Sequence, residues 1–85
     1  MEVRGKLLVY GTHADAKLVV QTLYYELPCY GKAFINESAF YDGAYEVRYE
    51  YSVRTTIANV KVKAKICLAL TKLRLIPRIK AIKQL

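Results

Sequence analysis

Negative charge is missing from the second half of the chain. All seven acidic residues lie within the first fifty positions of the 85-residue sequence. Beyond Tyr51 every charged residue is a lysine or an arginine. The net charge is +7. Because a block of positive charge attracts polyanions and acidic protein surfaces, nucleic acid and acidic proteins are the partners to expect.

Cysteine and histidine are also scarce. Cys29 and Cys67 lie far apart, and His13 is the sole histidine. This set of ligands is too small for the usual zinc and redox motifs, so neither a metal nor a cofactor is expected. His13, with Asp15 two residues away, could serve as a base for Cys29, but the spacing supplies no positioned partner. A surface histidine and a loop thiol are the favoured interpretation.

Motifs for phosphate binding and nucleophilic catalysis are absent. The sequence has no G-x-x-x-x-G-K-[ST], G-x-G-x-x-G or G-x-S-x-G pattern, so we expect no enzymatic activity. No apolar run approaches the roughly 20 residues of a membrane span, and the start MEVRGKLLVYG lacks the apolar core of a signal peptide. The expectation is one domain, residues 1–85, in a reducing cytoplasm and without membrane association.

The first half of the chain predicts two or three strands and a helix. Alternation predicts a strand over 3–10, and Thr12 with Asp15 resembles a capping box that opens a helix over 13–27. A weaker strand pattern covers 32–41 and ends in a tight turn at Asp42-Gly43. Residues 45–54 alternate cleanly, and the tyrosine-bearing side favours the core over a base-stacking platform.

The length of the stretch over 55–75 predicts a helix, although its lysines also alternate with apolar residues as they would in a strand. Helical spacing gives two apolar stripes on opposite sides. The first contains Ile57, Val60, Ala64, Cys67, Leu68 and Leu75, and the second contains Val62, Ile66, Ala69, Leu70 and Leu73. A small sheet cannot bury both stripes, so we expect Val62, Ile66, Leu70 and Leu73 to bind a partner.

The basic residues of this segment and of the residues that follow it are candidate phosphate contacts. They are Lys61, Lys63, Lys65, Lys72, Arg74, Arg78 and Lys80. Pro77 ends or kinks the helix, and residues 78–85 are either a further helical turn or an edge strand. The predicted fold is α+β, an antiparallel sheet with helices on one face, in the order βαββα or, with a last strand, βαββαβ.

The order of elements resembles the small dimerising subunit of the KEOPS complex, which makes threonylcarbamoyl-adenosine in transfer RNA. That family has a strand, a helix of the form A-x-x-V-x-x-x-L, a strand, a glycine turn, an alternating strand and a long final helix. The corresponding stretches here are GKLLVYGTHADAKLVVQTL, NESAFYDGAYEVRYEYS, TTIANVKVKAKICLAL and IPRIKAIKQL. The chain resembles a divergent member of this subunit family, or a paralogue of the subunit.

The resemblance implies a protein without catalysis of its own. It implies a homodimer, or a heterodimer with a paralogue, that docks its helices on the kinase-like catalytic subunit of KEOPS and helps to hold tRNA. Lysines on the RNA backbone would position the RNA without reading its sequence.

Two alternatives remain open. One is a free-standing nucleic-acid-binding protein of ferredoxin-like fold, from a virus or mobile element, that uses the open sheet face. Its binding residues would be Arg4, Lys6, Tyr10, Arg48 and Arg54. The other is an acylphosphatase-like enzyme, although the sequence after the first strand, YGTHADAK, shows no ligand-cradling arginine loop.

Overall fold

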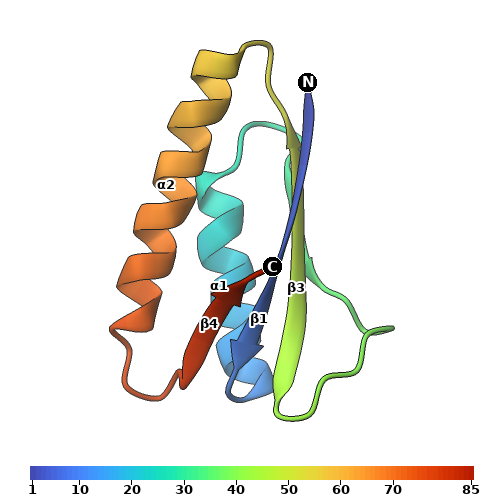
Figure 1. The fold of residues 1–85 in the computed structure, drawn as a ribbon, viewed down its shortest axis with the longest axis vertical. Coiled ribbons are helices and arrows are strands. Elements are labelled where there is room, and N and C mark those ends of the chain that lie inside the picture. Colours follow the sequence, from blue (N-terminus) through green and yellow to red (C-terminus); the bar gives the residue numbers. More distant parts are fainter.

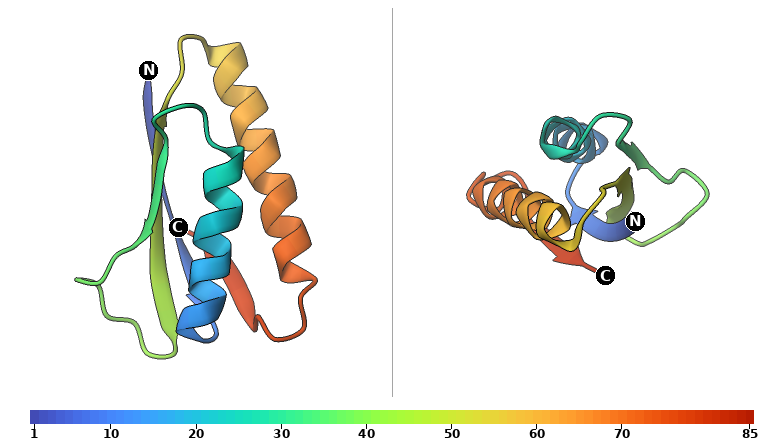
Figure 2. Two further views of the ribbon diagram at one scale, coloured as in Figure 1. Left: turned by 180° about the vertical axis from the view of Figure 1, so that it is seen from behind. Right: turned by 90° about the horizontal axis from the view of Figure 1, so that it is seen from above.

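Four strands and two helices follow one another in the order βαββαβ. The computed structural model describes residues 1–85, with β1 (Glu2–Tyr10), α1 (His13–Glu26), β2 (Lys32–Ile35), β3 (Ala44–Ser52), α2 (Thr56–Arg74) and β4 (Ala81–Gln84). The strands form one antiparallel sheet in the order β2-β3-β1-β4. Both helices cover the same face of it (Figure 1, Figure 2). The α+β prediction is confirmed, in its ferredoxin-like βαββαβ form.

α1 begins at the predicted capping box. Thr12 Oγ1 accepts a hydrogen bond from the Asp15 backbone N–H at 3.3 Å, and Asp15 Oδ2 accepts one from the Thr12 N–H at 2.9 Å. These two bonds satisfy amides that the helix itself leaves unpaired. The helix closes at Leu27, directly before Pro28, which cannot donate a helical hydrogen bond.

β1 and β3 pair along their whole length and form the centre of the sheet. The tyrosine side of β3 faces the helices, with Val47 and Tyr51 buried, as the alternation predicts. The Tyr51 hydroxyl donates to Asn59 Oδ1 of α2 at 2.6 Å, which ties this strand to the helix above it. Gly5 lies opposite Tyr49, and a Cβ at Gly5 would come within 2.1 Å of the ring. The close approach therefore requires glycine.

β2 is shorter than the strand predicted over 32–41. It ends at Ile35 because Asn36 turns the chain: its side-chain oxygen accepts from the Ser38 N–H at 3.2 Å, and its carbonyl from the Ala39 N–H at 3.3 Å. The predicted turn at Asp42-Gly43 is present, with Gly43 at a φ of 75°.

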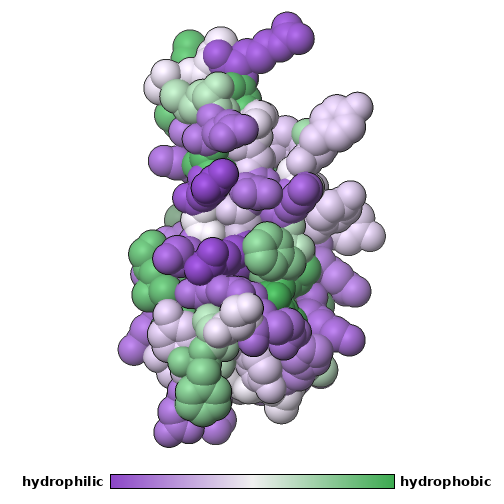
Figure 3. Space-filling view, turned by 90° about the vertical axis from the view of Figure 1, so that its right-hand side faces the viewer, coloured by the Kyte–Doolittle hydropathy of each residue, from purple (hydrophilic) through white to green (hydrophobic).

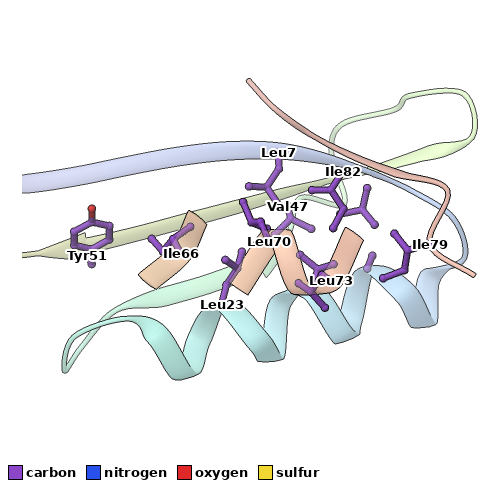
Figure 4. Packing of buried hydrophobic residues seen from close by; sticks show 12 residues of the cluster. Leu7, Leu23, Val47, Tyr51, Ile66, Leu70, Leu73, Ile79 and Ile82 are labelled. Carbon is purple, nitrogen blue, oxygen red and sulfur yellow. The ribbon is translucent and has the colours of Figure 1, made fainter. Parts of the chain in front are cut away.

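α2 is a helix over Thr56–Arg74, close to the predicted 55–75. Its first turn is capped by Thr55, whose Oγ1 accepts from the Ala58 N–H at 3.0 Å. Two apolar stripes are present, but the sequence-based choice of the partner-binding stripe is wrong. The stripe named for a partner, Val62, Ile66, Leu70 and Leu73, faces the sheet: the last three are buried and Val62 packs against them (Figure 4).

The hydrophobic core lies between the sheet and the two helices. Figure 4 shows Leu70 and Leu73 of α2 beside Leu23 of α1, and Leu7 and Val47 reaching toward them from the sheet. The placement of α2 beside α1 on one face of the sheet decides which stripe is buried, because only the inward stripe can meet both (Figure 2).

The last eight residues contain a strand. After α2 ends, Ile79 and Ile82 enter the core, and β4 pairs with the second half of β1. The guanidinium of Arg74 donates from Nε and Nη2 to the Ile82 carbonyl at 3.1 and 2.9 Å. Arg74 thus joins the end of α2 to the edge strand.

Candidate interaction site

α2 carries an exposed apolar stripe on the side opposite the core. We call it the outer stripe: Ile57, Val60, Ala64, Cys67, Leu68 and Leu75. Its four largest aliphatic members are exposed between 58% and 77%. Scattered exposed leucines are ordinary, but this set repeats at helical spacing along the whole of a 19-residue helix. An apolar face of this length, which only Thr71 interrupts, is typical of a surface that another element covers.

Cations lie along both sides of the outer stripe. By helical geometry Lys61, Lys65 and Lys72 lie on one side, and Lys63 with Arg74 on the other. No acidic residue occurs on α2. A surface that is apolar in the middle and positive at its edges complements an apolar stripe bordered by carboxylates.

A groove between α1 and α2 adjoins the outer stripe and has a volume of about 350 Å³. Leu68, Ala69, Leu73 and Ile76 contribute its apolar lining. Lys65 and Lys72 also line it, together with Thr22 and Glu26 from α1. Leu68 therefore belongs both to the outer stripe and to the groove, so that a partner seated on the stripe would also meet the groove.

Only part of the predicted phosphate-binding set is free to bind a ligand. Arg74 holds the Ile82 carbonyl, and Arg78 lies with its Nε 3.2 Å from Asp15 Oδ1. These two arginines serve the fold. The structure also separates the lysines, since Lys63 lies across α2 from Lys65, and Lys80 precedes β4. The basic segment does not form one continuous surface.

Asp15 connects the start of α1 with the segment before β4. The bond from the Thr12 backbone is the main cause that lowers the pKa of the Asp15 carboxyl, and the Arg78 charge lowers it further, against the opposing effect of burial. Both oxygens of this carboxylate are engaged by these partners, Oδ2 by the Thr12 N–H and Oδ1 by Arg78, and neither is paired with His13. His13 instead lies with Nε2 3.8 Å from Glu37 and its ring against Tyr45.

The open face of the sheet carries a second group of candidate residues. Arg4, Lys6 and Arg48 surround Phe34, which is 44% exposed, around a hollow of about 230 Å³. Charged and polar side chains cover most of this face, and hydrophobic ones gather in its lower half (Figure 3). The sequence predicted Phe34 to lie on a strand but not to bind a ligand. Its alternation with Ala33 and Ile35, which face the core, could have indicated that Phe34 lies on the open face.

Tyr10 and Arg54 were also predicted to lie on the open face, and the structure confirms this only for Tyr10. Tyr10 lies on the open face, with the Lys83 ammonium 5.3 Å from the ring centroid. Arg54, however, follows the end of β3 in the turn to α2, so its expected place on the sheet is wrong. The strand ends at Ser52, which removes Arg54 from the alternation.

Carboxylates partly neutralise the open face. Glu46 is buried there and accepts from Asn36 Nδ2 at 2.6 Å, from Arg48 Nε at 2.9 Å and from the Tyr41 hydroxyl at 3.3 Å. The Asn36 bond chiefly, then Arg48 and Tyr41, lower the pKa of the Glu46 carboxyl despite its burial. Glu50 Oε2 lies 3.7 Å from Arg4 Nε. Lys6 is therefore the cation of the hollow that no carboxylate engages.

Comparison with known proteins finds no family model that matches the chain, no similar curated protein and no similar solved structure. Neither helix has the length and apolar character that a membrane span requires. No group of three histidine, cysteine or acidic side chains comes together in a way that could hold a metal ion.

Proposed function

We propose that the chain is a non-catalytic accessory subunit that dimerises and binds a larger protein through the outer stripe of α2. The observation that carries the proposal is the apolar stripe on the outside of α2, which cations border on both sides. The complementary partner is an amphipathic helix whose apolar face is edged by carboxylates. A second copy fits this stripe less well, because lysines would then face lysines.

The resemblance to the KEOPS subunit gives this partner a candidate. In that assembly the chain would dock on the kinase-like catalytic subunit, and tRNA would lie near the exposed lysines. Lys61, Lys65 and Lys72 are available to the partner's carboxylates or to phosphates, whereas Arg74 and Arg78 are already engaged within the fold. The docking residues are those of the outer stripe, since the stripe named from the sequence is the core.

Titration of the chain with the kinase-like catalytic subunit tests the docking proposal. Leu68→Asp places a charge in the middle of the outer stripe and should weaken binding at least about a hundredfold, as expected for a hot-spot position. Phe40→Asp is the matched control, because Phe40 is 89% exposed in the loop between β2 and β3. Circular dichroism should show both variants folded. Equal binding by Leu68→Asp and the control would contradict the proposal.

The charged border makes a separate contribution that can be measured. Lys61→Glu and Lys72→Glu, on the same side of the stripe, should slow association and reduce its dependence on salt. Unchanged association rates would show that the partner does not present carboxylates along this side of α2.

The open face of the sheet favours a second candidate function, the binding of single-stranded nucleic acid. A base would stack on Phe34 while Lys6 meets a phosphate, as on other sheet surfaces that bind single strands. Phe34→Ala should weaken binding of an oligonucleotide by roughly 1–3 kcal/mol, and Lys6→Glu should lower the salt slope by about one. Phe40→Ala is the control. Affinity independent of salt would rule this candidate out.

A further inference from the structure

β1 is longer than β4, its neighbour on one side, and this leaves part of the β1 edge without a partner strand. β4 pairs with Leu7–Tyr10, and one more bond runs from the Leu85 N–H to the Lys6 carbonyl at 2.9 Å. Residues 2–5 extend past this point. On their other side they are fully paired with β3.

The backbone groups at the open edge can be assigned by alternation. Met1 exchanges hydrogen bonds with Val53 beside β3, whereas the carbonyls of Lys6 and Tyr10 accept from the β4 side. Since successive residues of a strand point their polar groups to opposite sides, the N–H and C=O groups of Glu2 and Arg4 face the open edge. A strand edge of this kind pairs readily with another strand.

A groove runs along the open edge on the helix side of the sheet. It has a volume of about 400 Å³. Its apolar and small lining residues include Val3, Gly5, Tyr49, Ile66 and Cys67. A strand added at the edge would direct every second side chain into this groove.

We propose that the occupant is the same segment of a second copy, paired antiparallel about a two-fold axis that passes between the two Val3 residues. In this register Glu2 of each copy lies opposite Arg4 of the other, and both residues are those whose backbone groups face the edge. The charges are therefore complementary at both pairs. Met1 and Val3 of the second copy point to the helix side, into the groove.

The other antiparallel registers are less favourable. Centring the axis on Arg4 places the two Arg4 residues opposite each other and would displace Leu85 from Lys6. Centring it on Glu2 pairs the two Glu2 residues and uses fewer free backbone groups. Only the register centred on Val3 matches opposite charges and leaves β4 in place. It joins two four-stranded sheets into one, with all helices on the same side.

This interface gives a place to the dimerising part of the proposed function and rests on that part alone. It uses β1 and the groove beside it, whereas docking uses the outer stripe and the α1–α2 groove. Cys67 is the one outer-stripe residue that also lines the groove beside β1. Leu68→Asp should therefore leave the dimer intact, and changes at Arg4 should leave docking of the partner intact. Either proposal can fail without the other.

Sedimentation equilibrium of the 85-residue chain, from about 1 μM to about 1 mM, tests the interface at affinities typical of small contacts. Arg4→Glu should raise the dimer dissociation constant about tenfold or more, because both pairs become repulsive. Glu2→Arg should do the same, and the two changes together should restore the dimer. General charge repulsion predicts the opposite for Arg4→Glu, which lowers the net charge of the +7 chain.

Lys32→Glu is the matched control. It changes the net charge as Arg4→Glu does and is an exposed position of the same sheet, but it lies on β2 at the opposite edge, so the dimer should persist. Amide hydrogen exchange adds a readout that does not depend on substitution: the Glu2 and Arg4 amides should become protected as the concentration rises. A chain that stays monomeric at every concentration, or a dimer that ignores both single reversals, would overturn the proposal.

Discussion

Leu68 and Leu70 offer a direct measurement of which side of α2 holds the fold together. They lie two residues apart in the middle of one helix, so they differ little in backbone context or in helix propensity. Leu70 is fully buried in the core, whereas Leu68 is 58% exposed. The same substitution, leucine to alanine, therefore probes the two faces separately.

The expected costs differ by several kcal/mol. Leu70→Ala removes a side chain from a packed core and should lower the free energy of unfolding by about 3–4 kcal/mol, as for other buried leucines. For 85 residues the whole stability is roughly 4–13 kcal/mol, so this loss is large. Leu68→Ala removes little buried area and should change stability by less than about 0.5 kcal/mol.

Urea denaturation followed by circular dichroism gives the comparison. With a slope of about 1.5 kcal/mol per molar urea, the Leu70→Ala midpoint should fall by roughly 2 M, while Leu68→Ala should overlay the wild type. Measurements at low micromolar concentration keep self-association from adding to the stability. Equal midpoints for the two variants, or a larger loss for Leu68→Ala, would refute the assignment of the inner and outer stripes.

Three further changes test local features of the fold. Asp15 and Glu46 have folded-state pKa values below their ordinary ones. The stability that they contribute is therefore fully present above the ordinary carboxyl pKa, near pH 4, and is lost as the pH falls through the folded-state pKa values. Acid titration of the unfolding free energy should show this loss, and Asp15→Asn should reduce it. Gly5→Ala should cost about 1–3 kcal/mol, because the new Cβ would clash with the Tyr49 ring, and a smaller loss in denaturation would contradict that contact. Thr12→Ala removes the cap of α1 and should cost about 1 kcal/mol, whereas no change in thermal melting would argue against the cap.

The strands and helices could be predicted where their signals are local. Thr12 and Asp15 define the start of α1 through bonds that span three residues, and the side-chain alternation of β3 needs only the strand itself. The length of α2 separates it from a strand in the same way. These features depend on residues that are close in the sequence, so one sequence is enough to predict them.

The choice between the two stripes of α2 could not be made from periodicity alone. Both stripes are apolar and both have lysines beside them, and only the placement of α2 beside α1 on the sheet decides which is covered. A weaker signal was present: the inner stripe runs without interruption through Ile66, Leu70 and Leu73, whereas Thr71 interrupts the outer one. The more continuous stripe is the better candidate for a core.

Other parts of the site were hidden for related reasons. β4 has four residues and pairs with a strand more than seventy positions earlier, so its pairing leaves little trace in the local sequence. The open edge of β1 follows from that shortness and was equally invisible. Arg74 and Arg78 read as free cations, because their partners, the Ile82 carbonyl and Asp15, come close only in the folded chain.

The internal ion pairs explain why the positive field of α2 is directed outward. Three of the seven acidic residues pair with arginines elsewhere: Asp15 with Arg78, Glu46 with Arg48 and Glu50 with Arg4. Glu37 lies beside His13. The exposed lysines of α2 have none of these carboxylates as partners. Glu26 lines the α1–α2 groove together with Lys65 and Lys72, but no ion pair joins it to them, so most of the charge along the outer stripe is left to solvent ions or to another molecule. The apolar residues of the stripe exclude solvent ions from its centre. A partner that brings both an apolar face and carboxylates would therefore satisfy the two requirements in one interface, and neither an apolar surface nor a polyanion alone would do so.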